Sequence, residues 1–436
     1  MIEEKYVKET PSLVACNRNF TSKAIEGYTT LIKEHKMEIK TEGSGLCPNR
    51  LQNVDAYLKR IVDSGRVAGA GGLIIRHGVW AYRKSFGMQD IADKIPLQND
   101  SIYRIYSMTK TFTVAAAMTL YERGLFKLHD PIGEFLPAFT NMQVARHDSR
   151  GCMELIPARS PITFQHLFTM TSGIPYPGGQ SYSARFLAGA NEKIAGDGKG
   201  LTTARIVDAA AQAPLCFHPG EYWMYGFSHD VLGRLIEVLS GKSLSHYMEE
   251  VIFKPLGLRD TAFYVPAEKQ GRLCKAYDFT EQGLTEITGL DTDAGKPFPP
   301  AFESGGGGLA STLDDVGRYA LMLLNAGKLD GERVLSRKTI DLIRRNHVAP
   351  SQLQHFGFPG MAGYGYGLGV RTMLDTGAAG LNGSTGEWAW DGMLGTWYCV
   401  DPAEDLAAVF LIQRRPGGND DLPKRFAQTV YAAIDD

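Results

Sequence analysis

Ser107 and Lys110 stand three residues apart, at the ends of the tetrapeptide Ser-Met-Thr-Lys. The segment from Ser107 to Gly124 is apolar on nearly every side after its first turn, which predicts a buried helix that the glycine closes. Positions i and i+3 share one face of a helix, so the lysine can lie beside the serine hydroxyl. The amide groups at the helix start favour negative charge, and burial lowers the pKa of a lysine until it can act as a base. This spacing predicts a nucleophilic serine that a lysine activates.

A second interpretation of Ser107 and Lys110 stays open at this point. Serine is common in the chain, so roughly one such tetrapeptide is expected by chance. Ser107 would then only cap the helix, while the stem of Lys110 packs on apolar surface and its ammonium reaches water. The choice between the two interpretations depends on the rest of the chain.

Tyr225 is the candidate for a third catalytic group. It follows Pro219-Gly220 and directly precedes a helical stripe of apolar residues. Its phenol would relay a proton between Lys110, Ser107 and a leaving group. Most tyrosines only pack, and Tyr222 is the competing candidate in the same segment.

Two glycine-rich segments could bring backbone close to a reacting group. The segment 388–397 is rich in tryptophan and glycine and leads into a strand. A strand edge beside the nucleophile would give a backbone N–H to an oxyanion, and the alternative is a tight turn with packed aromatic rings. Residues 305–308 are all glycine and predict a turn or a close backbone approach, since no phosphate-binding G-x-x-x-x-G-K-[ST] motif is present.

Several other chemistries have no supporting motif in the sequence. There is no HExxH pair, so we expect no metal at the site. There is no GxSxG elbow, which argues against an α/β-hydrolase. Gly69-Ala-Gly71 lacks the third glycine of a dinucleotide fingerprint, because Ile74 stands there, and we expect no cofactor.

The composition limits the classes of partner. The 436 residues are 44% hydrophobic and 22% charged, as in ordinary folded chains. A net charge of -2 without a long basic run argues against nucleic acid. No stretch is long and apolar enough to span a membrane, and the N-terminus has no apolar signal region. We therefore expect a cytoplasmic location, a small-molecule partner, and free thiols for the six cysteines, which form no CxxC pair.

Strands at both ends of the chain must position these residues. Helical spacing is expected at 51–64, 231–239 and 422–433, with another candidate helix near 21–35. Strands are expected at 70–75, 79–86, 363–371, 387–389, 395–400 and 406–413. We therefore predict an α/β (α+β) fold, with an extension at 1–47, an α/β domain from 48–145 and 300–436, and a mainly helical domain at 146–299.

These residues, with several further motifs, resemble the serine β-lactamase and penicillin-binding-protein superfamily, in particular its class C β-lactamase-like branch and the family VIII carboxylesterases. The resemblance runs from about Pro48 to the C-terminus. The motifs that carry it lie, in chain order, at 105–113, 124–131, 162–173, 219–225, 255–261 and 306–312. It implies a five-stranded antiparallel sheet flanked by helices, beside an all-helical region, with the site between them.

The resemblance also implies roles for single residues. Ser107 matches the nucleophile, Lys110 its lysine and Tyr225 the tyrosine of a Y-x-N motif. Trp390-Asp391-Gly392 occupies the place of a K-T-G motif. The backbone N–H groups of Ser107 and Met393 would then form the oxyanion hole.

Two departures from the family pattern bear on the substrate. Phe227 stands in place of the Y-x-N asparagine, which helps to hold the amide of a β-lactam. Trp390 stands in place of the K-T-G lysine, and an indole has no charge for a substrate carboxylate. Together with Asp391 and Gly392, these residues are expected to bind substrate, and the changes favour a neutral, hydrophobic ester.

Four functions follow from this reasoning. The first is a serine carboxylesterase that works through an acyl-enzyme on Ser107. The second is an acyltransferase at the same site. The third is a β-lactamase or D-alanyl-D-alanine carboxypeptidase, which Phe227 and Trp390 disfavour. The fourth is a catalytically inactive binding protein, which the joint presence of Ser107, Lys110 and Tyr225 disfavours.

Overall fold

The computed structural model describes residues 38–290, 293–356, 361–417 and 421–436, and residues 39–436 form one compact unit. The helix expected near 21–35 and most of the expected extension at 1–47 lie outside the described residues. The division of the rest of the chain into two domains stays a prediction.

The main sheet of the described residues is antiparallel and contains strands from both ends of the chain, as the sequence predicts. Its strand order is β12 (Tyr364–Tyr366), β13 (Arg371–Met373), β14 (Trp388–Asp391), β15 (Trp397–Asp401), β16 (Leu406–Leu411), β1 (Gly69–Arg76), β2 (Val79–Asp90) and β3 (Ile95–Pro96). The α/β class is confirmed, but eight strands replace the expected five. The expected strand at 363–371 is in fact two strands, because a turn from Gly367 to Val370 reverses the chain between them.

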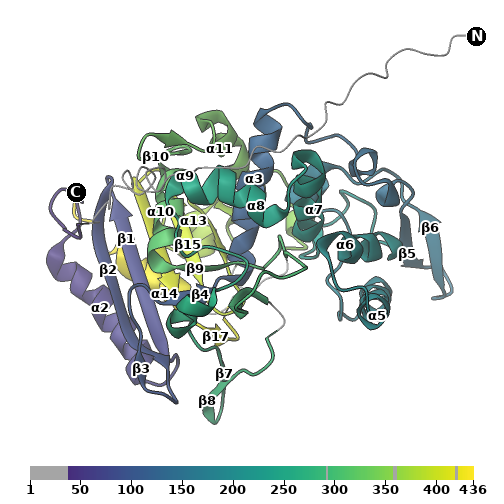
Figure 1. Ribbon diagram of the computed structural model, residues 1–436. Helices are drawn as coiled ribbons and strands as arrows, with labels where there is room; N and C mark the ends of the chain where they lie inside the picture. Colours follow the sequence, from purple (N-terminus) through teal and green to yellow (C-terminus); the bar gives the residue numbers. More distant parts are fainter. Residues whose placement is uncertain (1–37, 291–292, 357–360, 418–420) are drawn as a thin grey trace, which may run out of the picture. The chain divides into compact units, whose positions relative to one another are not determined.

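Strand β1 separates two cores, because its successive side chains point to opposite faces. Leu73 and Ile75 belong to the core with α3 (Thr109–Glu122) and α10 (Leu313–Leu324). Ile74 belongs to the other core, with α2 (Pro48–Asp63) and α14 (Leu422–Tyr431). Figure 1 shows α2 on the outer side of β1 and β2, with α10 on the opposite side. Both faces are covered, so every residue of the strand is buried.

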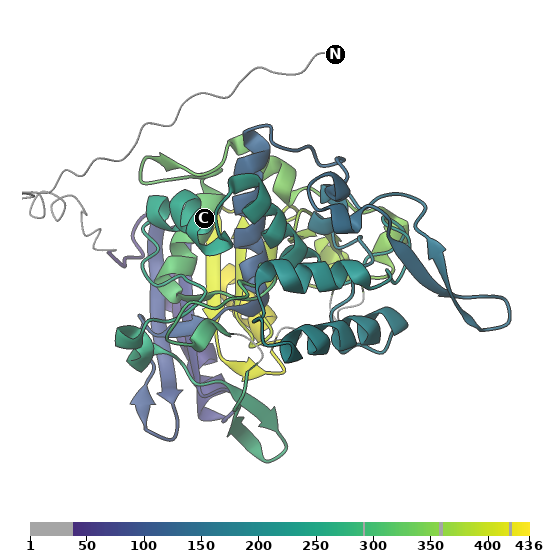
Figure 2. The same ribbon diagram turned by 45° about the vertical axis from the view of Figure 1, so that its right-hand side comes forward.

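The helices in the middle of the chain pack on one another. They are α4 (Phe164–Phe168), α5 (Tyr182–Gly196), α6 (Thr203–Gln212), α7 (Ser228–Ser240), α8 (Leu244–Met248) and α9 (Lys254–Leu256). Helices α7 and α8 contact α3, and α7 does so through the apolar stripe that the sequence predicts. The region is less helical than expected, since it also holds the hairpins β5 (Gln143–His147) with β6 (Met153–Pro157) and β7 (Tyr277–Thr280) with β8 (Gly283–Glu286). The β5–β6 hairpin projects outward in Figure 2.

Short elements complete the described residues. Strand β4 (Ile102–Arg104) pairs with β9 (Ala310–Thr312), β10 (Lys328–Leu329) with β11 (Glu332–Arg333), and β17 (Arg414–Arg415) with β7. The remaining helices are α11 (Arg337–Arg344), α12 (Pro350–Leu353) and α13 (Thr376–Ala379). The β4–β9 pair leads directly into the segment that carries Ser107.

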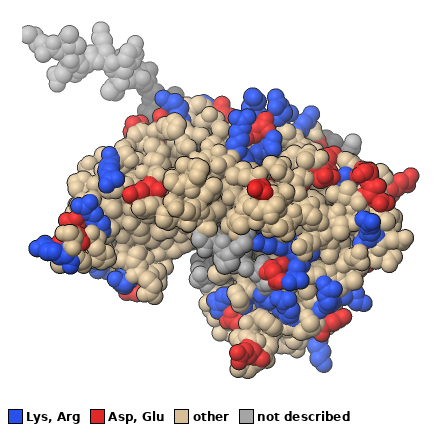
Figure 3. All heavy atoms as spheres, turned by 180° about the vertical axis from the view of Figure 1, so that it is seen from behind, with Lys and Arg blue, Asp and Glu red and all other residues tan. Residues whose placement is uncertain are grey.

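The surface carries charges of both signs. On the face seen in Figure 3, basic and acidic side chains are intermingled, in line with the net charge of -2. None of the helices within the described ranges has the length and apolar character needed to cross a membrane.

Candidate active site

Ser107 lies in a tight helical turn, Tyr106–Met108, immediately before α3. Tyr106 has a φ of 43°, a left-handed conformation that an L-residue adopts at a cost of roughly 1–2 kcal/mol. The turn is fixed from one side by the Ile105 amide, which donates to the carbonyl of Leu309 at 3.0 Å. Backbone strain directly before a nucleophile is a common feature of reactive sites.

Lys110 is completely buried one turn later and reaches Ser107. Its Nζ lies 3.1 Å from Ser107 Oγ and donates to the carbonyl of Gly306 at 2.6 Å. Burial lowers the pKa of Lys110 to about 7, although the carboxylates of Asp230 and Asp391 act in the opposite direction. A large share of the lysine is therefore a neutral amine near neutral pH, with a lone pair for the Ser107 proton. The interpretation as a lysine that reaches water is wrong.

The Gly306 carbonyl is held in place by Asp230, which is buried at the start of α7. Asp230 Oδ1 accepts hydrogen bonds from the Gly306 amide at 3.1 Å and from Ser304 Oγ at 2.5 Å. A Cβ on Gly306 would lie 2.4 Å from Asp230 Oδ2, so the close approach requires glycine. The prediction of a close backbone approach at 305–308 is confirmed here. Asp230 thereby positions the group that orients Lys110.

Tyr225, and not Tyr222, lies beside Ser107. Its phenol is hydrogen-bonded to Ser107 and accepts from Trp390 Nε1 at 3.3 Å, and Lys110 Nζ lies 4.6 Å from its ring centre. Burial raises the pKa of Tyr225, so the phenol keeps its proton at neutral pH. Tyr222 is instead 38% exposed and packs against aromatic rings outside this cluster.

The turn between β14 and β15 is pressed against the Ser107 turn. A Cβ on Gly392 would lie 2.3 Å from the carbonyl oxygen of Ile105, and Thr396 Oγ1 donates to that same carbonyl at 3.1 Å. This contact places Met393 in the wall of the cavity that also exposes Ser107. Among the described residues, the Met393 amide donates to no backbone carbonyl. The arrangement suits an oxyanion hole made of two backbone N–H groups.

A cavity of about 1110 Å³ opens from Ser107. Its wall is largely apolar and aromatic, and it includes Tyr106, Tyr176, Leu201, Ile206, Tyr225, Phe263, Phe298, Phe302, Trp390 and Met393, with Lys296, Asp391 and Arg415 as its charged members. Phe227 does not line it. That side chain is buried and packs edge-on against Tyr176, so it supports the wall rather than facing a ligand. Gly392 acts through its close packing and is likewise absent from the wall.

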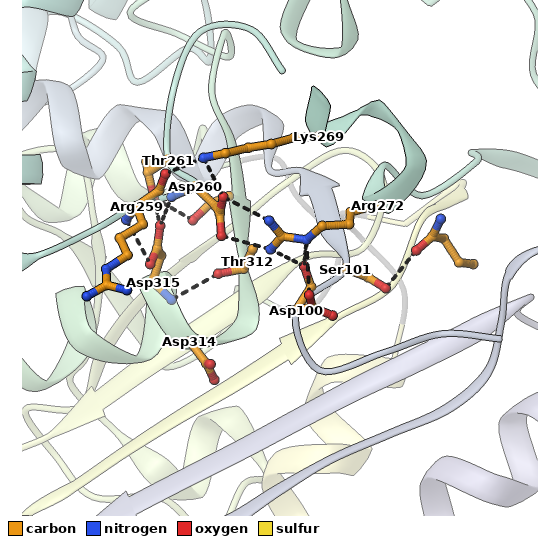
Figure 4. Close-up of polar contacts among 12 residues, drawn as sticks. Asp100, Ser101, Arg259, Asp260, Thr261, Lys269, Arg272, Thr312, Asp314 and Asp315 are labelled. Atoms are coloured by element: carbon orange, nitrogen blue, oxygen red, sulfur yellow. Dashed lines mark hydrogen bonds and ion pairs between the residues drawn. The ribbon is translucent and has the colours of Figure 1, made fainter. Parts of the chain in front are cut away.

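Phe263 lines the cavity and follows a segment, 259–261, that is hydrogen-bonded to the start of α10. Asp315 accepts from the amides of Arg259 and Asp260 at 3.3 and 2.8 Å, and from Thr261 Oγ1 at 2.9 Å. Figure 4 shows these contacts beside the ion pairs of Asp260 with Lys269 and Arg272. The polar cluster fixes the loop on which Phe263 stands.

Sequence reasoning missed Asp230 and most of the aromatic wall. Asp230 has a weak signal, an acid in the first buried turn of a predicted helix. Tyr176, Phe263 and Phe302 stand in irregular segments without periodic pattern. Across the described ranges, no three His, Cys, Asp or Glu side chains gather in an arrangement that would hold a metal ion.

The sequence matches the family described as Beta-lactamase over residues 54–433. It is 33% identical over 408 residues to Protein Rv1367c of Mycobacterium tuberculosis, covering 88% of this chain and 99% of the relative. It is 28% identical over 375 residues to Esterase EstB of Burkholderia gladioli, covering 82% and 89%. The solved structure of EstCE1, a hydrolase with promiscuous acyltransferase activity, is similar with a TM-score of 0.72 and 25% identity, over 89% of this chain and 98% of that one.

Proposed function

Because the chain belongs to the Beta-lactamase family, we propose that it is a serine carboxylesterase that forms an acyl-enzyme on Ser107. The observation that carries the proposal is the contact of Ser107 with Lys110 and Tyr225 at the floor of a large, mainly apolar cavity. The similarity to an esterase, EstB, supports the same reaction class.

Acylation uses the groups in contact with Ser107. Neutral Lys110 accepts the Ser107 proton across 3.1 Å while Oγ bonds to the acyl carbon. The negative charge on the carbonyl oxygen is held by the N–H groups of Ser107 and Met393. As the C–O bond of the ester breaks, the phenol of Tyr225 gives its proton to the leaving oxygen and regains one from Lys110. Water then attacks the acyl-enzyme by the same route and releases the acid.

The cavity wall favours a neutral substrate. The indole of Trp390 packs beside Tyr225, with ring centres 5.7 Å apart, and offers no charge to a substrate carboxylate. The two cations of the wall already have partners, since Arg415 forms an ion pair with Asp278 and Lys296 lies over the ring of Phe298. A carboxylate left unpaired against the indole costs several kcal/mol. Uncharged esters are therefore the proposed substrate class, and penicillins and D-alanyl peptides are disfavoured.

Acyl transfer to an alcohol is the second candidate, because the cavity is large. Pockets that enclose drug-sized ligands usually measure about 300–1,000 Å³, and this one measures about 1110 Å³. A short acyl group on Ser107 leaves room for an alcohol in place of water. The transferase activity named for EstCE1 supports the same candidate.

A comparison of two substrates tests the esterase proposal against a β-lactamase. We expect kcat/KM for p-nitrophenyl butyrate to exceed that for a cephalosporin by at least about 100-fold, the equivalent of some 3 kcal/mol. Ser107→Ala should abolish both reactions, and Ser149→Ala, at an exposed serine that does not line the cavity, serves as its control. If the cephalosporin is the better substrate, the protein is a β-lactamase and the argument from Trp390 fails.

A further inference from the structure

Arg371 and Asp391 form an ion pair in the wall behind the nucleophile that the proposed reaction does not use. Strands β13 and β14 pair antiparallel with Arg371 opposite Ala389, so Asp391 is the diagonal neighbour on the same face. The guanidinium Nη1 lies 2.6 Å from Asp391 Oδ2. The register of two adjacent strands thus brings the two charges together.

The two partners differ in their access to the cavity. Asp391 lines it and its side chain is 18% exposed, whereas the Arg371 side chain is 6% exposed and is absent from the wall. The guanidinium carbon also lies 5.8 Å from the ring centre of Trp390, the preceding wall residue. Arg371 therefore lies behind a carboxylate and an indole, both of which separate it from a bound substrate.

The other charged groups around the pair come from several elements. Lys424 of α14 interacts with both partners, and Glu387, just before β14, interacts with Arg371. Lys110 interacts with Asp391 from the catalytic side. Of the two carboxylates near Arg371, Asp391 lines the cavity and Glu387 does not. The negative charge of Asp391 therefore offsets the positive charge of Arg371 on the side where a substrate would lie.

We infer that Asp391 masks the positive charge of Arg371 and thereby determines that the site rejects anionic esters. Trp390 alone does not explain this selectivity, because a cation already stands directly behind it. Removing the carboxylate charge would leave the guanidinium without an opposing charge on its cavity side and favour a substrate with a carboxylate. The inference deepens the proposed esterase function and rests on it for the choice of substrates.

The test compares two p-nitrophenyl esters of similar size, the neutral butyrate and the anionic hemisuccinate. Asp391→Asn keeps an oxygen acceptor for Arg371 but removes the charge. We expect it to raise the ratio of kcat/KM for hemisuccinate over butyrate at least tenfold relative to wild type. Arg371→Gln should move the ratio the other way, and the double variant should return it close to the wild-type value.

A matched control is the pair of Arg83 and Asp314. Its atoms are also 2.6 Å apart and its side chains are 23% and 20% exposed, but neither residue lines the cavity. Asp314→Asn should leave the ratio unchanged. If folded Asp391→Asn, checked by circular dichroism, also leaves the ratio unchanged, the inference is wrong while the esterase proposal stands.

Binding provides a readout that does not depend on catalysis. In the Ser107→Ala background, calorimetry with 4-phenylbutyrate and its neutral amide measures the same charge preference. Asp391→Asn should strengthen binding of the carboxylate relative to binding of the amide at least tenfold. An unchanged ratio of the two dissociation constants would contradict the inference. If the wild type hydrolyses neither ester, the proposed function fails, and this binding ratio still decides the role of Asp391. If Asp391→Asn does not fold, Arg371→Gln decides it by the opposite shift.

Discussion

The ionisation of Lys110 should set the pH dependence of ester hydrolysis. A lysine with the ordinary pKa of 10.5 is neutral in about 3 of 1,000 molecules at pH 8, whereas a pKa of about 7 makes about nine in ten neutral. Burial therefore raises the population of the active base by about 300-fold at that pH. In the proposed mechanism the neutral amine accepts the Ser107 proton, so kcat/KM should rise up to about pH 7 and then level off. Tyr225, whose pKa is raised, should add no falling limb below pH 9.

Asp230→Asn tests this reasoning because the carboxylate raises the pKa of Lys110. The asparagine oxygen can still accept from Ser304 and Gly306, which keeps the local geometry. We expect the midpoint of the profile to fall by about half a unit or more. The assay follows p-nitrophenyl butyrate at the wavelength where p-nitrophenol and its anion absorb equally, with Asp314→Asn as the control. A midpoint that stays in place or rises, or a wild-type profile that falls above pH 7, would refute the assignment of Lys110 as the base.

Three further variants test the supports of the site. Tyr225→Phe should lower kcat at least about 100-fold, the scale of positioned acid–base catalysis, while Tyr222→Phe should have little effect in the same steady-state assay. Gly306→Ala should lower kcat about tenfold or more with little change in KM, because its Cβ would displace Asp230 or the carbonyl that orients the lysine. Asp315 has a pKa raised to about 6 by burial, so the ionised form costs stability in the folded state. The protonated carboxyl stabilises the fold at low pH, and this contribution is lost as pH rises from about 4 through 6. Urea unfolding should therefore show wild type losing about 2.5 kcal/mol relative to Asp315→Asn between pH 4 and 7, and a constant difference would contradict it.

The sequence predicts the contact of Ser107 with Lys110 because it depends on local geometry alone. A separation of three residues on a helix brings the two side chains together. The apolar residues of the same helix predict that the lysine is buried, and burial lowers its pKa. Local geometry does not distinguish Tyr225 from Tyr222. The prediction of Tyr225 depended on its match to the tyrosine of the family's Y-x-N motif. The hairpin at 70–86 followed from the His77-Gly78 turn between two predicted strands, and the sheet shared by both termini followed from strands predicted at both ends of the chain.

The parts that the sequence does not predict depend on long-range register. Arg371 meets Asp391 only because a turn splits the segment 363–371 and sets β13 against β14 in one particular alignment. The carbonyl of Gly306 meets Lys110 across 196 positions of the chain, and no local pattern specifies that approach. The resemblance implied five strands, and the larger observed sheet includes edge strands that no local pattern specifies, since β3 and β12 contain only two and three residues.

A covalent intermediate on Ser107 is the most direct test of the central claim. Rapid mixing with p-nitrophenyl butyrate, acid quench and mass spectrometry should show a protein heavier by one butyryl group, about 70 Da, with the added mass on the peptide that contains Ser107. Ser107→Ala should show no added mass, and Tyr225→Phe should accumulate less acyl-enzyme in the same interval. An acyl group found on another residue, or ester hydrolysis that Ser107→Ala retains, would contradict the account.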